Sequence, residues 1–153
     1  MELNSQDRKL LQILQSDART SIDQLAEEVG LSSASVQRHL KKLRDNKVIE
    51  AEVAVVSPKA VGQAMTFLVF VELERDNLEY MAQFKTKIKK ETHIQQCYYV
   101  TGEADFILVV YAKDMEDFDA FTKKMFFDDS NVRRYKTSVV MERSKVSLAL
   151  PLN

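Results

Sequence analysis

Apolar residues recur at helical spacing through the first 45 positions of the chain. The spacings are three and four residues, as on one face of an α-helix. These positions are Leu10, Leu11 and Leu14, then Ile22, Leu25, Ala26 and Val29, then Val36, Leu40 and Leu43. We therefore predict three short helices, over residues 3–15, 21–30 and 32–45, around one small shared core.

Polar residues and one glycine mark the ends of these predicted helices. Asn4, Ser21 and Ser32 stand where a side chain can accept a free backbone amide at a helix start. Gln24 lies three residues after Ser21, the spacing of a capping box. Gly30 directly follows the second helical pattern, and glycine is favoured there because it tolerates positive φ. Two helices joined by such a tight turn predict a helix-turn-helix.

The hydrophobic period changes to two after the third helix. Residues 50–56 are apolar at alternate positions, which predicts a strand and hence a winged helix-turn-helix. Pro58 and Gly62 then interrupt the pattern. We expect a DNA-binding domain over residues 1–56 and a linker over residues 57–64.

The rest of the chain, residues 65–153, combines strand-like runs with two helical patterns. Its order is strand, helix, strand, strand, helix, strand, and the predicted segments are 65–73, 76–91, 94–101, 105–112, 114–127 and 132–142, with a possible fifth strand over 146–150. This order predicts an α+β, ferredoxin-like βαββαβ domain with both helices on one sheet face. The other face carries apolar residues that need a cover, so we predict a homodimer that pairs through its sheets.

Composition agrees with an ordinary globular protein. The chain has 153 residues, of which 45% are hydrophobic and 29% charged, and its net charge is −1. Cys97 is the one cysteine, so no intrachain disulfide can form and a reducing compartment is expected. The sequence has no signal peptide and no long apolar run, which disfavours secretion and membrane insertion. We expect a cytoplasmic protein.

The predicted third helix is basic away from its apolar face. Only Asp45 interrupts the positive residues between Arg38 and Lys47, so we expect little pairing within the helix. Its start is small and hydroxylic, which lets a phosphate or base edge approach closely. We predict that this helix binds double-stranded DNA through Ser33, Ser35, Gln37, Arg38, Lys41, Lys42 and Arg44. The alternative is a helical hairpin with a solvated basic face.

A family resemblance rests on the helix-turn-helix together with two later motifs. The quoted stretches are ARTSIDQLAEEVGLSSASVQRHLKKLRDNKVI, VTGEADF and SVVMER. In these the chain resembles the leucine-responsive regulatory protein/AsnC family of feast/famine regulators. The resemblance implies a prokaryotic, nucleoid-associated transcription factor without a cofactor. It also implies dimers that assemble into tetramers or octamers, and an amino-acid effector such as leucine or methionine bound between dimers.

The resemblance places effector contacts at Val100, Thr101, Gly102, Asp105, Met115, Thr137, Ser138 and Val139. Chemistry adds a rationale, because a glycine turn exposes backbone amides to a carboxylate while Asp105 or Glu103 can accept from an ammonium. Tyr99 and Met115 can border the effector side chain. The alternatives are a plain hairpin turn at Gly102, a capping carboxylate at Asp105 and core packing at Met115.

Two other classes of protein compete with a DNA-binding regulator. A ferredoxin-like dimeric enzyme is one, but His39 and His93 lack partners at metal-ligand spacing. Cys97 also lacks a base partner in the sequence, and no phosphate-binding glycine loop is present. A metabolite sensor that does not bind DNA is the other, and the basic helix argues against it.

Overall fold

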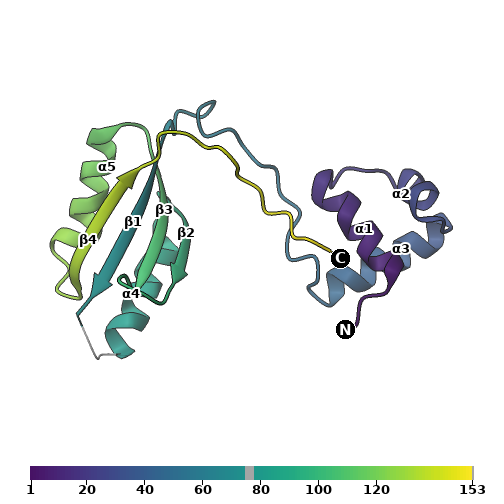
Figure 1. Ribbon diagram of the computed structural model, residues 1–153, viewed down its shortest axis with the longest axis horizontal. Helices are drawn as coiled ribbons and strands as arrows, with labels where there is room; N and C mark the ends of the chain where they lie inside the picture. Colours follow the sequence, from purple (N-terminus) through teal and green to yellow (C-terminus); the bar gives the residue numbers. More distant parts are fainter. Residues whose placement is uncertain (75–77, 153) are drawn as a thin grey trace. The chain divides into compact units, whose positions relative to one another are not determined.

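The computed structural model describes residues 1–74 and 78–152 and divides into two compact units. One unit contains Met1–Ala54 together with Lys145–Asn153, and the other contains Val55–Ser144. Figure 1 shows the first as helices and the second as a sheet with helices packed on it. Among the described residues, no helix has the length and apolarity needed to cross a membrane.

Three helices form the first unit, as predicted. They are α1 (Ser5–Ser16), α2 (Ile22–Val29) and α3 (Ser33–Asp45). Their core consists of the predicted apolar face residues, with Leu10, Leu25, Val36 and Leu43 at most 1% exposed. Burial of these stripes stabilises helices that are individually too short to persist in water.

The predicted helix ends are confirmed. The side chains of Ser21 and Ser32 each accept a backbone N–H three residues on, at 3.2 Å. Gly30 ends α2 in the left-handed conformation, with φ of 73°. Asn4 caps α1 as predicted, and Asp7 completes a reciprocal capping box of the kind that the sequence analysis had expected at Ser21 and Gln24, where the structure shows the Ser21 contact.

Two predicted strands are absent from this unit. Residues 50–56 and 146–150 have no regular secondary structure, and both carry exposed apolar side chains. An alternating pattern becomes a strand only when a neighbouring strand accepts its hydrogen bonds, and neither segment pairs with a strand of the described residues. The tail instead returns to α1, where Gln15 exchanges two hydrogen bonds with the backbone of Leu150, at 2.7 and 3.0 Å. Residues 145–153, expected in the second domain, thus group with the helical unit.

The second unit has the predicted ferredoxin-like order. Its elements are β1 (Met65–Leu73), α4 (Leu78–Lys90), β2 (Ile94–Tyr99), β3 (Phe106–Ala112), α5 (Met115–Thr122), a π-helical turn η1 (Lys123–Phe127) and β4 (Val132–Val139). The sheet order is β2-β3-β1-β4, and all neighbours are antiparallel. The expected start of α4 at residue 76 lies outside the described residues.

The two faces of the sheet differ in burial. Alternate residues of β1 and β3, such as Phe67, Val69 and Leu108, are fully buried on one face, where α4 and α5 cover the sheet (Figure 1). On the opposite face Phe70 and Ile107 are only partly buried. Pairing of this open face with a second copy remains a prediction.

One predicted helix changes character near its end. The sequence analysis expected a single helix over residues 114–127, but α5 ends at Thr122 and a π-helical turn follows. Lys87 donates to the carbonyl of Met125 at 2.6 Å and to Asp129 at 3.1 Å. The Lys87 ammonium thus provides a donor for a carbonyl of the π-helical turn and holds the turn against α4.

Candidate functional site

The third helix presents a polar surface built on an apolar anchor. Its buried face of Val36, Leu40 and Leu43 holds it in the helical core. The predicted DNA contacts on its other faces are exposed at Gln37, Arg38, Lys41, Lys42 and Arg44, and partly buried at Ser33 and Ser35. The predicted contact set thus forms one continuous helical surface.

Hydrogen bonds to both neighbouring helices fix the orientation of α3. The Ser33 hydroxyl donates to the carboxylate of Asp23 on α2 at 2.7 Å. The His39 imidazole lies 2.7 Å from the carboxylate of Asp7 on α1, and Asp7 is only 1% exposed. Because Ser33 is engaged with Asp23, it positions α3, and its contact with DNA stays a prediction.

Two cations of α3 are paired with carboxylates. Lys41 pairs with Asp45 one turn on, and Arg44 makes a two-pronged contact with Glu52 at 2.9 and 3.0 Å. The hydrogen bond from Arg44 lowers the pKa of the Glu52 carboxyl, although burial opposes that shift. Within α3 the i,i+4 pairing is limited to Lys41 and Asp45, in agreement with the prediction of little pairing, whereas the Arg44 pair was not foreseen because Glu52 lies beyond the helix.

Two other cations of this surface keep their charge available. Among the described residues, the Arg38 guanidinium donates a side-chain hydrogen bond to the Ser35 hydroxyl alone, at 3.4 Å. Lys42 makes no ion pair with any described residue. A paired cation must break its ion pair before it can bind phosphate. Arg38 and Lys42 are therefore better candidates than Lys41 and Arg44 for contacts with the phosphate backbone of DNA.

The glycine turn between β2 and β3 is fastened to the end of β1. The Asp105 amide donates to the carbonyl of Val71, and the Asp105 carboxylate accepts the Leu73 amide at 2.8 Å. Gly102 has φ of 110°, a conformation that strains any side chain although open space surrounds the position. Asp105 therefore holds the turn against the end of β1, whether or not it also contacts a ligand.

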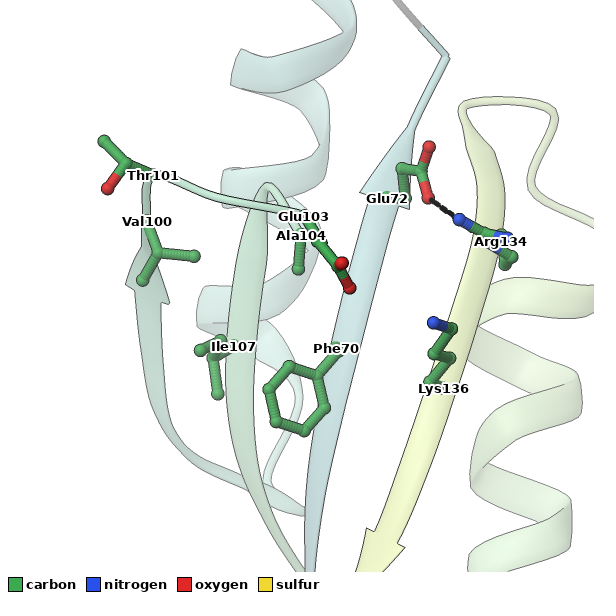
Figure 2. Close-up of a pocket in the computed structure, with 9 residues that line it drawn as sticks. All are labelled: Phe70, Glu72, Val100, Thr101, Glu103, Ala104, Ile107, Arg134 and Lys136. Carbon is green, nitrogen blue, oxygen red and sulfur yellow. Dashed lines mark hydrogen bonds and ion pairs between the residues drawn. The ribbon is translucent and has the colours of Figure 1, made fainter.

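A pocket of about 240 Å³ lies where this turn meets the open face of the sheet. It is lined by Phe70, Glu72, Val100, Thr101, Glu103, Ala104, Ile107, Arg134 and Lys136. Figure 2 shows the turn residues along one side and the charged side chains of β4 along the other. Arg134 donates twice to Glu72, at 2.8 and 3.1 Å.

The structure divides the predicted effector residues into separate groups. Val100 and Thr101 line the pocket. The carboxylate of Asp105 is engaged with Leu73, and Tyr99 packs its ring against Phe106 and lies under the ammonium of Lys85. Gly102 shapes the turn without lining the pocket.

The remaining predicted effector residues lie away from the turn, with Thr137 beside the middle of β1 and the others nearer the opposite end of the sheet. Val139 pairs with Phe67, whereas Phe106, next to the turn, pairs with Val71. Thr137 and Ser138 lie beside Val139 on β4. Met115 starts α5 after the far end of β3, roughly 20 Å along the strand at about 3.3 Å per residue. One chain therefore does not bring Met115, Thr137, Ser138 and Val139 to the turn.

Most of the pocket escaped the sequence analysis. Phe70, Arg134 and Lys136 come from two strands adjacent only in the folded sheet, and no local motif joins them. The sequence does predict that Arg134 and Lys136 lie on the same face of β4, because they are two residues apart in a strand.

A second polar cluster lies away from the pocket. The His93 imidazole bridges Glu91 at 2.8 Å and Asp117 at 3.1 Å, and Lys124 donates to Glu91 at 2.7 Å. Burial alone would raise the pKa of Glu91, but these hydrogen bonds outweigh it and lower the pKa to about 2. Within residues 1–74 and 78–152, no group of three or more His, Cys, Asp or Glu side chains is arranged so that it could hold a metal ion.

Comparison with known proteins extends this picture. Residues 3–50 match the model of the winged helix-turn-helix DNA-binding domain, and residues 66–150 match that of the Lrp/AsnC ligand binding domain. The fold and these matches define a DNA-binding transcriptional regulator with a ligand-binding domain. The chain belongs to the Lrp/AsnC family.

Individual relatives support the same assignment. The chain is 45% identical over 152 residues to the HTH-type transcriptional regulator y4tD of Sinorhizobium fredii, covering 99% of this chain and 90% of that protein. It is 29% identical to the DNA-binding transcriptional activator DecR of Escherichia coli, over 98% and 99% of the two chains. The crystal structure of regulator NMB0573 of Neisseria meningitidis in complex with L-Met superposes with a TM-score of 0.94 at 28% identity, covering 99% and 98%.

Proposed function

We propose that this protein is a sequence-specific regulator that binds operator DNA through α3 and changes its DNA affinity or assembly when a small amino acid binds. The observation that carries the proposal is the exposed polar surface of α3, fixed by Asp7 and Asp23 and bearing the uncommitted Arg38 and Lys42. Phosphate contacts by these cations supply affinity, and Gln37 and Ser35 are the proposed contacts to base edges. Lys41 and Arg44 contribute once they release their acidic partners.

Two-fold assembly follows from the same proposal. A dimer places two copies of α3 on successive major grooves, about 34 Å apart. The open sheet face supplies the contact between subunits, and further pairing gives tetramers or octamers. We assign residues 1–56 to DNA binding, residues 57–64 to the linker and residues 65–153 to assembly and effector binding, with the tail returning to the helical unit.

The effector is proposed to be an amino acid such as leucine or methionine, held where subunits meet. Tyr99, Val100, Thr101, Gly102 and Asp105 would come from one subunit, because they lie on one turn. The residues that lie away from the turn would come from another subunit: Met115, Thr137, Ser138 and Val139. Support for the ligand class is the L-Met complex of the neighbour from Neisseria meningitidis. The protein would act in the prokaryotic cytoplasm, associated with the nucleoid, as a regulator and not as an enzyme.

A selection experiment followed by titration tests the proposal. Duplexes bound by the full chain are enriched from a random pool, and the affinity for the selected duplex is measured by fluorescence anisotropy with and without each amino acid. We expect a two-fold symmetric sequence and an affinity or oligomeric state that changes with one or a few amino acids. Enrichment of no sequence would contradict DNA recognition, and indifference to all twenty amino acids would contradict the effector response.

A further inference from the structure

We propose that Lys47, in the turn that ends α3, is a further contact with the phosphate backbone of DNA, held in a backbone conformation that favours glycine. The inference rests on the proposed DNA binding through α3 and adds a residue that lies beyond the end of that helix. Two observations carry it, the geometry of the turn and the availability of the Lys47 charge.

The turn after α3 is a Schellman motif. The Lys47 amide donates to the Arg44 carbonyl at 3.0 Å, and the Val48 amide donates to the Leu43 carbonyl at 2.9 Å. Val48 also packs against the helical core to which Leu43 belongs, a hydrophobic contact that often accompanies this motif. The motif needs a left-handed residue directly before Val48, and that residue is Lys47, with φ of 57°.

The chain ends α2 with a similar turn but places a glycine in it. The amides of Gly30 and Leu31 both donate to the Ala26 carbonyl, and Gly30 has φ of 73°. All three glycines of the chain have positive φ, and Lys47 is the only other described residue that does. A left-handed conformation destabilises a residue that has a Cβ, whereas glycine adopts it without strain. Lysine at this position therefore lowers the stability of the fold.

The helix dipole offers one alternative explanation for Lys47. A cation is favourable near the negative end of a helix. The last turn of α3 already contains Lys42 and Arg44, which lie in ordinary helical conformation. Because these two cations can act on the dipole without strain, the dipole alone does not account for Lys47.

A phosphate backbone matches the charge and exposure of Lys47. The residue is exposed and makes no ion pair with a described residue, whereas Arg44 is held by Glu52. A lysine ammonium is a compact charge on a flexible stem, which suits a phosphate and reads no base sequence. Lys47 would thus extend the cationic surface of α3 past the end of the helix.

Three substitutions at this position separate charge from strain. Lys47→Arg keeps both, Lys47→Met keeps the strain without the charge, and Lys47→Gly removes both. Each variant of the full chain is unfolded in urea, and its binding to the selected duplex and to a duplex of scrambled sequence is measured by fluorescence anisotropy over a series of salt concentrations. Lys89→Met, on the exposed surface of α4, is the control for loss of a lysine.

We expect the salt slope of DNA binding to fall by roughly one in Lys47→Gly and Lys47→Met, equally on both duplexes, because one phosphate contact is lost. Lys47→Arg should restore the slope, and Lys89→Met should not change it. Lys47→Gly should nevertheless be more stable than the wild-type protein, with a folding equilibrium constant raised about two- to fivefold. Lys47→Met should show no such gain.

Three results would overturn the assignment. A wild-type slope in Lys47→Gly and Lys47→Met, with a lowered slope in the double variant Arg38→Ala with Lys42→Ala, would remove Lys47 and leave DNA binding through α3 in place. Lower stability of Lys47→Gly than of the wild-type protein would show that the lysine serves the helix end. A wild-type protein that binds neither duplex would remove the proposed function and this contact together.

Discussion

The imidazole Nδ1 of His39 lies 2.7 Å from the Oδ1 of Asp7, which joins the middle of α3 to the first turn of α1. The second oxygen of Asp7 accepts the Asn4 amide at 3.1 Å, completing the capping box. Burial alone would raise the pKa of Asp7, but the hydrogen bonds from His39 and Asn4 outweigh it, and the pKa lies below the usual 3.8. One buried carboxylate therefore both caps α1 and orients α3.

Loss of this carboxylate should destabilise the helical unit. Asp7→Ala removes the cap and the His39 contact, so we expect the free energy of unfolding to fall by roughly 1–3 kcal/mol at neutral pH. Because the folded-state pKa is lowered, the contribution is full above the usual pKa of 3.8 and is lost as pH falls below it. Urea unfolding followed by circular dichroism measures the change. Glu28→Ala, exposed on α2, is the control, and equal stability of the two variants would contradict this role.

The cluster around His93 predicts a stability optimum in pH. Hydrogen bonds to Glu91 and Asp117 raise the pKa of His93 above 6.5 despite partial burial, so its contribution is full below 6.5 and lost as pH rises through the raised pKa. The pKa of Glu91 falls from 4.5 to about 2, so its contribution is full above 4.5 and lost toward pH 2. Stability from this cluster should therefore be greatest between about pH 4.5 and 6.5.

Two measurements check the cluster. Nuclear magnetic resonance titration should place the pKa of His93 above 6.5, and thermal unfolding should show Tm falling on the alkaline side. His93→Gln should remove that alkaline fall. A His93 pKa at or below 6.5, or an alkaline fall that persists in the variant, would contradict the assignment.

Asp105 should stabilise the fold in the absence of any ligand. Asp105→Ala leaves the Leu73 amide without its acceptor, so we expect a loss of roughly 1–2 kcal/mol in the free energy of unfolding. Asp105→Asn keeps an acceptor oxygen and should lose less. Urea unfolding of the ligand-free protein measures both. If Asp105→Ala unfolds like the wild type yet no longer binds an amino acid, the carboxylate acts on the ligand and not on the strand.

The Arg44–Glu52 pair should restrain DNA binding. Glu52→Gln frees the guanidinium and removes a negative charge beside the helix, so affinity for a selected duplex should rise by up to about fivefold, the range for an exposed pair. Fluorescence anisotropy at fixed salt measures this, with Glu2→Gln as the control. Unchanged or weaker binding by Glu52→Gln would show that Arg44 takes no part in DNA contact.

Local rules predicted the helical unit well. Ser21, Ser32 and Gly30 act within a few residues of their own positions, and the apolar stripes need only the geometry of one helix. The order of strands and helices in the second unit likewise follows from alternation along the chain. The alternation of residues 50–56 misled because a strand also needs a partner, which the sequence pattern does not show.

Contacts between distant residues were beyond the sequence analysis. The His39–Asp7 contact spans 32 positions, and the Glu72–Arg134 contact spans 62. No periodicity links such residues, so the pocket emerged only from the sheet register that sets β1 beside β4. The family resemblance grouped the predicted effector residues, but they do not share a location in one chain, because β3 separates the turn from Met115.

The central claim is that α3 lies against DNA, and the salt dependence of binding tests it most directly. The slope of log affinity against log salt concentration counts the phosphates that the protein neutralises, at about 0.9 per contact. We predict that Arg38→Ala with Lys42→Ala lowers the magnitude of the slope by roughly two, while Lys89→Ala leaves it unchanged. A double variant with the wild-type slope would contradict the placement of α3 on the duplex.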